Sequence, residues 1–512
     1  MSRYTRRDFI KLAGGFVSAA TLTPGLLNAV EAQENRRFNV LFLMTDQHHH
    51  GVMGCAGNPV VKTPNLDRLA SEGARFTNAV CSTPFCSPTR ASLLTGLWPH
   101  THGVVQNVDG IERRGLDDKA VATEQILFDT GYKTYQMGKW HLGDISAMRC
   151  YSKDKEDTLS EQAYKAFVKD APRDKWPKPR DGEVQIDDIA YAPDMAKFHN
   201  FWKDETKRTP QDLSIIGRQL IPAEYTYESW LTDKCTDLIK KHKNDNFMIT
   251  WSVGPPHAYW VVPDPFYSMY DPDKMPLSPS WNDQPKAYQE SQPARLGKFM
   301  GEKGVRETLR CYYGQVSMVD WCIGRILSSL DEHDLAKDTL VVFLSDHGDM
   351  QSAHHMVDKA MPGYYEDIVR VPMLVRYPKT IKQGKIINTH AGSVDIMPTL
   401  LDYAGQPVPE GVQGVSLRPL LEGKASDDDR PAFCERGLDT PSASRMIRTR
   451  RWKYAIFGKQ RRELFDLQND PYEMTNLADD SSYSGVMAKL HKQLLLHMET
   501  TGDPALQVIP NT

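Results

Sequence analysis

The strongest constraint on the fold of this 512-residue chain comes from three short apolar runs, each of which ends at polar residues. They cover residues 38–44, 247–253 and 340–344. Continuous apolar runs of this length are typical of strands that are buried on both faces of a sheet. Helix-like segments precede the second and third runs, over residues 227–243 and 316–330. Alternating strands and helices predict an α/β fold, a sheet with helices on both faces.

Polar residues stand just beyond these runs. Asp46 follows the first run, His257 the second and Asp346 the third. In open α/β sheets, side chains beyond the carboxyl ends of the strands face a common crevice. We therefore expect these three residues to lie close together, although a carboxylate there could equally cap the following helix.

A chain of this length is expected to form more than one structural unit. We predict a catalytic unit over residues 36–405, with loop-face insertions at about 151–225 and 255–300, where Lys, Asp and Pro are frequent. Residues 406–512 predict a small α+β unit. Half-exposed antiparallel strands are expected at 446–449, 452–457 and 463–467, and a final helix is expected at 487–498.

Charge and cysteine spacing exclude several classes of function. The net charge is −4 and the Lys and Arg residues form no stripe, which argues against a nucleic-acid partner. The eight cysteines contain no CxxC pair and no zinc pattern. We expect most of them to be small buried residues, with one or two disulfides left open.

The first 32 residues predict an export signal rather than part of the fold. Residues 5–11 read TRRDFIK, which resembles a twin-arginine signal, and a weakly apolar run follows over 12–27. Residues 30–32 are typical of a cleavage site. We therefore expect the twin-arginine machinery as a partner and a periplasmic or secreted location, with a membrane anchor as the weaker alternative.

The segment with the clearest chemical meaning is 86–96, which reads CSPTRASLLTG. It resembles the sulfatase signature, Cys-x-Pro-x-Arg followed by Leu-Thr-Gly. Further segments resemble the same family in the same order: LMTDQ at 43–47, TPNLD at 63–67, GKWHLG at 138–143, PPH at 255–257, LSDHGD at 344–349, and RWKY and ELFD at 451–454 and 463–466. Chance agreement of so many spaced motifs is implausible.

This resemblance implies a fold and a chemistry. The fold is an alkaline-phosphatase-like mixed sheet flanked by helices, with a small C-terminal subdomain that has an antiparallel sheet. In this family a formylglycine-generating enzyme oxidises the motif cysteine, here Cys86, to formylglycine (3-oxoalanine). One hydroxyl of the hydrated aldehyde attacks sulfur, and the other then expels sulfate.

The resemblance also implies roles for individual residues. Arg90 matches the arginine that supports the formylglycine, and Lys139 and Lys359 match the lysines that hold sulfate oxygens. His257 matches the residue that protonates the leaving oxygen, and His141 matches a residue that hydrogen-bonds to the diol. Taken one at a time, each could instead be a surface ion pair or a buried polar residue.

The metal ligands implied by the same motifs are Asp46, Gln47, residue 86, Asp346 and His347. Mostly oxygen ligands suit Ca²⁺, with Mg²⁺ possible, and the imidazole leaves Mn²⁺ open. Many relatives carry a second Asp where this chain has Gln47, which removes one negative charge.

Three functions follow in order of expectation. The first is sulfate ester hydrolysis on a sulfated carbohydrate or a similar small ester. The second is a phosphonate monoester or phosphodiester hydrolase, or a choline-sulfatase-like enzyme, on the same scaffold. The third is a binding protein with an inactive site, against which the intact motif positions argue.

Overall fold

The structure is a computed structural model, and it describes residues 38–108, 115–117, 120–143, 161–192, 195–196, 215–283, 292–359, 363–426, 428–438, 440–459 and 461–510. Residues Asn39–Thr512 form one compact unit, to which the description below applies. The segment 1–32 lies outside the described residues, as does Cys150. None of the described helices combines the length and the hydropathy needed to cross a bilayer.

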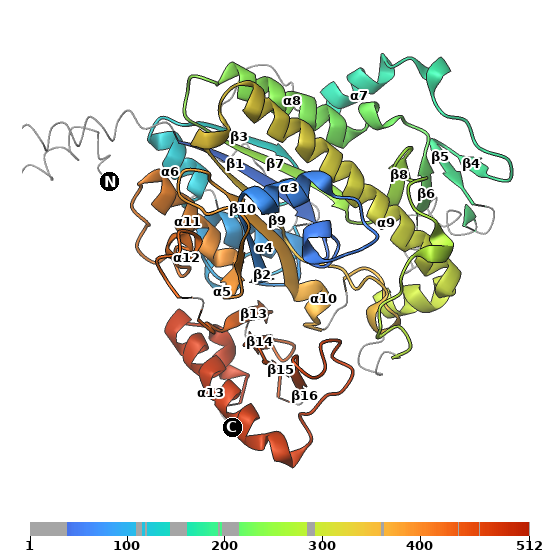
Figure 1. Cartoon of the computed structure of the whole chain (residues 1–512). Coiled ribbons are helices and arrows are strands. Elements are labelled where there is room, and N and C mark those ends of the chain that lie inside the picture. Colours follow the sequence, from blue (N-terminus) through green and yellow to red (C-terminus); the bar gives the residue numbers. More distant parts are fainter. Residues whose placement is uncertain are drawn as a thin grey trace, which may run out of the picture. The chain divides into compact units, whose positions relative to one another are not determined.

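An eight-stranded mixed sheet forms the centre of this unit (Figure 1). The strand order is β11-β2-β10-β9-β1-β7-β3, and β12 pairs with β2. The bounds are β1 Asn39–Asp46, β2 Ala74–Val80, β3 Lys133–Gly138, β7 Phe247–Pro256, β9 Thr339–Ser345, β10 Arg370–Arg376, β11 Lys385–Ile387 and β12 Ala391–Gly392. The three apolar runs of the sequence are β1, β7 and β9, so these predictions are confirmed.

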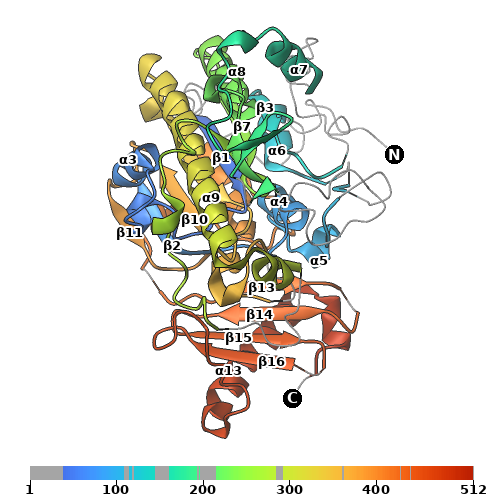
Figure 2. The same ribbon diagram turned by 90° about the vertical axis from the view of Figure 1, so that its right-hand side faces the viewer.

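Strand β1 lies between β9 and β7 and runs parallel to both, and all three strands are buried on both faces. Leu41 and Leu43 of β1 pack in one cluster with residues of α3, α8 and α9, whereas Val40 and Phe42 are buried on the opposite face. Figure 2 shows α4 and α6 on the side of the sheet away from α3. The helices of this unit include α3 Pro64–Glu72, α4 Cys86–Thr95, α5 Pro99–His102, α6 Thr123–Asp129, α8 Tyr227–Lys241, α10 Glu366–Val369, α11 Ile396–Ala404 and α12 Arg418–Leu421.

Helix α9 is longer than the spacing over 316–330 indicates. It covers Gln292–Glu332, with a break at Gly301, where φ is +61°. A positive φ is accessible to glycine without a steric cost, so the two helical parts meet at this residue. The first part falls within the Pro-rich segment 255–300, where no helix is expected from composition.

A second, four-stranded sheet was not expected from the sequence. Its order is β4-β5-β6-β8, and β6 pairs parallel with β8. The bounds are β4 Val184–Ile186, β5 Ile189–Tyr191, β6 Ile216–Gln219 and β8 Trp260–Pro263, and helix α7 covers Glu161–Lys169. These strands are only three or four residues long, too short for an alternating pattern to stand out. Parts of both segments predicted as insertions lie outside the described residues.

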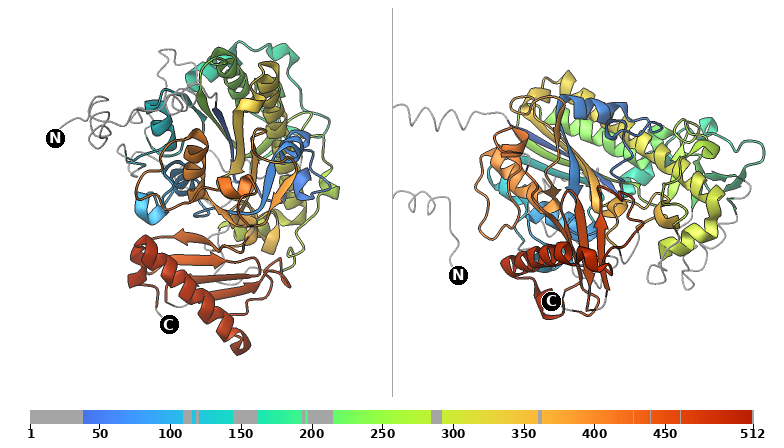
Figure 3. Two further views of the ribbon diagram at one scale, coloured as in Figure 1. Left: turned by 60° about the vertical axis from the view of Figure 1, so that its left-hand side comes forward. Right: turned by 60° about the horizontal axis from the view of Figure 1, so that its bottom comes forward.

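The C-terminal part forms an antiparallel sheet, as predicted, with the order β13-β14-β15-β16. Its strands are β13 Ala432–Arg436, β14 Ser444–Arg448, β15 Trp452–Phe457 and β16 Arg461–Asp466, and helix α13 Ser484–Thr501 packs along the sheet (Figure 3). The expectation of half-exposed strands is wrong for β14, which is buried throughout, and for β15, whose four central residues are all buried. Ile447 faces α13, and Arg448 on the other face forms an ion pair with Glu366 of α10.

The described cysteines are all free thiols in the structure. Six of these seven are buried, and Cys55 is partly exposed. Their burial confirms the expectation that most of them serve as small core residues.

A buried carboxyl on α6 makes the stability of the fold depend on pH. Glu124 is fully buried, and Thr250 of β7 donates to its Oε1 over 3.4 Å. Burial raises the pKa of Glu124 from 4.5 to about 7. Between these values the folded chain keeps a proton that the unfolded chain releases, so the free energy of unfolding falls as pH rises.

We expect Glu124→Gln to stabilise the protein by about 3 kcal/mol at pH 8 and to have little effect near pH 4.5. Glutamine has the shape of the protonated carboxyl and cannot ionise. Urea unfolding at both pH values measures the difference. Glu499→Gln, at an exposed position, provides the control. An equal effect of Glu124→Gln on stability at both pH values would refute the raised pKa of Glu124.

Candidate active site and metal centre

The site lies at the edge of the central sheet where the parallel strands end. Asp46 is the last residue of β1, Asp346 follows β9 and His257 follows β7. Strands β1, β7 and β9 run parallel in adjacent positions, so these residues emerge at one edge. The expectation of a common crevice edge for these three positions is therefore met.

Cys86 reaches the same edge by another route. Strand β2 ends at Val80, and a short loop leads to Cys86, the first residue of α4. Every residue of α4 is buried, so this helix is fixed in the core. The unpaired N–H groups of a helix N-terminus favour negative charge, which suits a position where an anion reacts.

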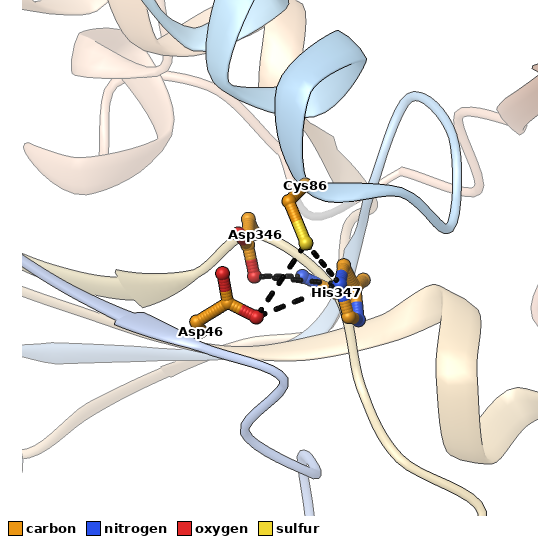
Figure 4. Close-up of side chains that lie close together, drawn as sticks. All are labelled: Asp46, Cys86, Asp346 and His347. Atoms are coloured by element: carbon orange, nitrogen blue, oxygen red, sulfur yellow. Dashed lines mark hydrogen bonds and ion pairs between the residues drawn. The ribbon is translucent and has the colours of Figure 1, made fainter. Parts of the chain in front are cut away.

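Four side chains converge at this point, as Figure 4 shows. The Cys86 Sγ lies 3.2 Å from Nε2 of His347 and 3.6 Å from Oδ1 of Asp46. The ligand atoms of Asp46, Cys86, Asp346 and His347 all lie within 4.8 Å of one another. The chain thus brings together four of the five residues that sequence analysis proposes as metal ligands.

Arg90 links the two carboxylates of this group. Its Nε donates to Asp346 Oδ2 over 2.9 Å, and its Nη2 donates to Asp46 Oδ2 over 3.2 Å. Its Nη1 donates to the Lys139 carbonyl oxygen and to Ser252 Oγ. Because Arg90 stands one helical turn after Cys86, α4 supplies both the thiol and the guanidinium.

Lys139 enters the site through a tight turn at the end of β3. Gly138 has φ +78°, and a Cβ there would lie 2.0 Å from the Ser252 carbonyl oxygen. That oxygen accepts the Lys139 N–H over 2.8 Å. Lys139 Nζ lies 2.6 Å from Asp46 Oδ2. His141, two residues further on, is half-buried and has φ +60°.

Lys359 and His257 form a pair on the other side of the thiol. Lys359 Nζ lies 3.9 Å from Cys86 Sγ and 2.7 Å from His257 Nε2. The His257 Nδ1 lies 2.6 Å from the Ala258 carbonyl oxygen, which can only accept. Nδ1 therefore carries the proton, and Nε2 accepts from the lysine.

The charges at the site act on one another through a water-poor interior. Burial opposes ionisation of Asp46, but Lys139, His257, Arg90 and His347 together outweigh burial and hold the pKa of Asp46 well below its ordinary value. Burial and the charge of Asp46 raise the pKa of Asp346 to about 6. Burial also opposes ionisation of Cys86, yet Lys359 and Lys139 lower the pKa of the thiol. An anionic group at this position is therefore stabilised.

The donor set fits a divalent cation. Two buried carboxylates supply oxygen ligands, which hard cations prefer. His347 Nδ1 lies 2.9 Å from the Gly348 carbonyl oxygen, which leaves Nε2 directed at Asp46 and Asp346. A ligating imidazole is held by its second nitrogen in this way. These residues could hold Ca²⁺, Mg²⁺ or Mn²⁺.

Two polar residues near the thiol and Arg90 were missed in sequence analysis. Asn107 Nδ2 lies 4.0 Å from Cys86 Sγ, and Asn107 Oδ1 accepts the Ser87 N–H. Ser252 Oγ accepts from Arg90 over 2.9 Å. Asn107 lies outside the family motifs, and Ser252 stands in an apolar strand, so neither had a local signal.

The chain resembles known proteins along most of its length. A family model described as Sulfatase matches residues 38–406, and one described as N-sulphoglucosamine sulphohydrolase, C-terminal, matches residues 352–500. An ulvan-active sulfatase of Formosa agariphila is 30% identical over 93% of this chain and 84% of its own. An N-acetylglucosamine-6-O-sulfatase of Bacteroides thetaiotaomicron is 29% identical over 92% and 87%. A phosphonate monoester hydrolase structure from Silicibacter pomeroyi is 25% identical, with a TM-score of 0.71 over 92% of this chain and 96% of that one.

Proposed function

Because this chain belongs to the sulfatase family, its activity is the hydrolysis of sulfate esters, and we propose that its substrate is a sulfated carbohydrate. The relatives named for ulvan and for 6-O-sulfated N-acetylglucosamine support this substrate class. The single observation that carries the hydrolytic function is that the Cys86 side chain lies together with two carboxylates, an imidazole and two lysines.

Cys86 is the proposed nucleophile position, after conversion to formylglycine by a formylglycine-generating enzyme. The aldehyde supplies, when hydrated, an oxygen nucleophile in place of sulfur. The sequence CSPTR at 86–90 supports this modification. Cys86 is the first residue of α4, and its Sγ lies 3.9 Å from Lys359 Nζ and 3.2 Å from His347 Nε2, which supports an anionic nucleophile at this position.

We assign the cation site to Asp46, Gln47, Asp346 and His347, together with residue 86, and propose Ca²⁺ as its occupant. When bound, the cation polarises the sulfate oxygens and stabilises an oxygen anion. Oxygen atoms outnumber nitrogen atoms among the ligands, which favours Ca²⁺ over softer ions. Arg90 offsets the mutual repulsion of the two aspartates.

The remaining residues bind the substrate and move protons. Lys139 and Lys359 flank the nucleophile and would hold the sulfate oxygens as their charge grows. His257 would protonate the leaving oxygen from Nε2, after this nitrogen takes up a proton and gives up its contact with Lys359 Nζ. Burial together with Lys359 lowers the pKa of His257, which makes its imidazolium a stronger acid. His141 would remove the proton from the second hydroxyl of the nucleophile.

We also propose that the protein is exported through the twin-arginine pathway to the periplasm or beyond. The motif TRRDFIK at 5–11 and the apolar run after it support this location. A large sulfated carbohydrate outside the cell is consistent with an exported enzyme.

A phosphonate monoester hydrolase is the second candidate, which the structure from Silicibacter pomeroyi supports. We expect kcat/KM on 6-O-sulfated N-acetylglucosamine and on para-nitrophenyl sulfate to exceed that on a para-nitrophenyl phosphonate ester by about 100-fold or more. The matching family model and the two named sulfatases favour the sulfates, whereas the two lysines beside the nucleophile suit either ester, because both carry a single negative charge. Initial rates of alcohol release over a range of substrate concentrations measure the ratio.

Chelation of divalent cations provides the control for this panel, because it should remove all three activities together. A higher kcat/KM on the phosphonate than on both sulfates would reject the first candidate in favour of the second. Hydrolysis of none of the esters by protein with a modified residue 86 would reject both.

A further inference from the structure

The side chain of Gln47 is held by two buried carboxylates. Its Nε2 donates to Asp349 Oδ2 over 2.6 Å and to Asp358 Oδ1 over 2.7 Å. All three residues are buried. A carboxylate only accepts, and an amide nitrogen has two hydrogens to donate, so both hydrogens are used. This arrangement determines which end of the amide is nitrogen and which is oxygen.

The amide oxygen consequently points the other way, toward the reactive group. Gln47 Oε1 accepts from Lys359 Nζ over 3.1 Å, and the same Nζ lies 3.9 Å from Cys86 Sγ. Oε1 therefore belongs to the lining of the site, and Nε2 belongs to the layer behind it.

The backbone of Gln47 is fixed as well. Its N–H donates to Asp346 Oδ1 over 3.1 Å, and its carbonyl oxygen accepts from Tyr312 over 2.6 Å. Its φ is +63°, a conformation that non-glycine residues adopt at a cost of about 1 kcal/mol or more. Hydrogen bonds to both its N–H and its carbonyl oxygen hold Gln47 in this strained conformation, which is typical of residues at ligand-binding sites.

We propose that Asp349 and Asp358 are positioning residues that hold the Gln47 amide oxygen as a ligand for the divalent cation. This inference rests on the proposed function, because it takes the cation site of Asp46, Asp346 and His347 as given. It also explains why glutamine occupies position 47. A carboxylate there would face two further carboxylates, whereas the amide presents donors to them and an oxygen to the cation.

The test is the affinity of the full-length protein for Ca²⁺, measured by isothermal titration calorimetry after chelation, with Mn²⁺ in parallel. We expect Asp349→Asn to weaken binding by about 10-fold and Gln47→Glu to weaken it by about 10–100-fold, the range seen for groups that orient metal ligands. Weaker Ca²⁺ binding by Gln47→Glu would show that the position of the oxygen ligand matters more than its charge. By charge alone, an added carboxylate near a cation would tighten binding.

A combined variant tests the arrangement directly. In Gln47→Glu with Asp349→Asn and Asp358→Asn, donors and acceptors exchange places, since asparagine amides can donate to a glutamate. We expect this triple variant to regain most of the affinity lost by Gln47→Glu alone. Recovery by two further substitutions cannot come from a loss of folding.

Asp320→Asn is the matched control, since Asp320 is a buried aspartate that accepts the Asn65 and Leu66 N–H groups at the start of α3. It should lower the melting temperature and leave the Ca²⁺ affinity unchanged. Wild-type Ca²⁺ affinity in Asp349→Asn, or tighter Ca²⁺ binding in Gln47→Glu, would overturn the positioning role and leave the proposed cation site intact. Failure of the wild-type protein to bind either cation would overturn the cation site and the inference with it.

Discussion

Replacing Cys86 by alanine should abolish ester hydrolysis and leave the protein folded. The proposed nucleophile derives from this side chain, and loss of a nucleophile lowers kcat by about 10⁴-fold or more. The side chain is small and fully buried at the start of α4, so alanine costs about 1 kcal/mol of stability or less. Turnover of a sulfated sugar and thermal unfolding, measured on the same preparation, test both parts.

Cys322→Ala is the matched control, because Cys322 is a fully buried thiol in α9, within the core cluster of α3 and α8. It should lose some stability and keep wild-type kcat. Mass spectrometry of the peptide bearing residue 86 from the native host should show the loss of H₂S and the gain of one oxygen. A peptide with an intact thiol from fully active protein would contradict the proposal.

Replacing Arg90 by alanine should cost both stability and activity. Arg90 is buried and contacts the carboxylates of Asp46 and Asp346, so its removal takes away the ion-pair partner that the two share and leaves Lys139 beside Asp46 alone. Breaking a buried ion pair in this way costs about 3–5 kcal/mol. We expect kcat/KM to fall by about 100-fold as well, because the ligand carboxylates lose the group that orients them.

Two further variants separate these effects. Arg90→Lys keeps the charge but cannot bond both carboxylates and the Lys139 carbonyl at once, so it should lie between alanine and wild type. Arg445→Ala removes another buried arginine, which pairs with Asp503 next to α13, and should lower stability without changing kcat per folded molecule. Equal kcat/KM in Arg90→Ala and wild type would show that Arg90 serves folding alone.

Much of the central fold was predictable because its signals are local. A strand buried on both faces is apolar at most positions, and β1, β7 and β9, which are buried along almost their whole length, show this. Parallel neighbours end at one edge, so Asp46, Asp346 and His257 could be placed together before their distances were known.

The layer behind the site could not be predicted in the same way. Gln47 lies about three hundred positions before Asp349 and Asp358, and nothing in the residues next to any of the three indicates that their side chains meet. The same holds for Ser252 and Arg90, which come from β7 and α4. The burial of β14 on both faces also depends on partners distant in sequence, α13 and α10.

The sequence by itself determined three parallel strands of the central sheet, β1, β7 and β9, the edge at which they end and, through its motifs, the family and the chemical type of the site. Those properties follow from apolar periodicity and residue type, which act over a few neighbouring residues. Only the tertiary structure decided which atoms face one another: the guanidinium between two carboxylates, and the amide whose nitrogen and oxygen are told apart by two aspartates. Hydrogen-bond directions are set by packed elements far apart in the chain, and a linear pattern does not encode them.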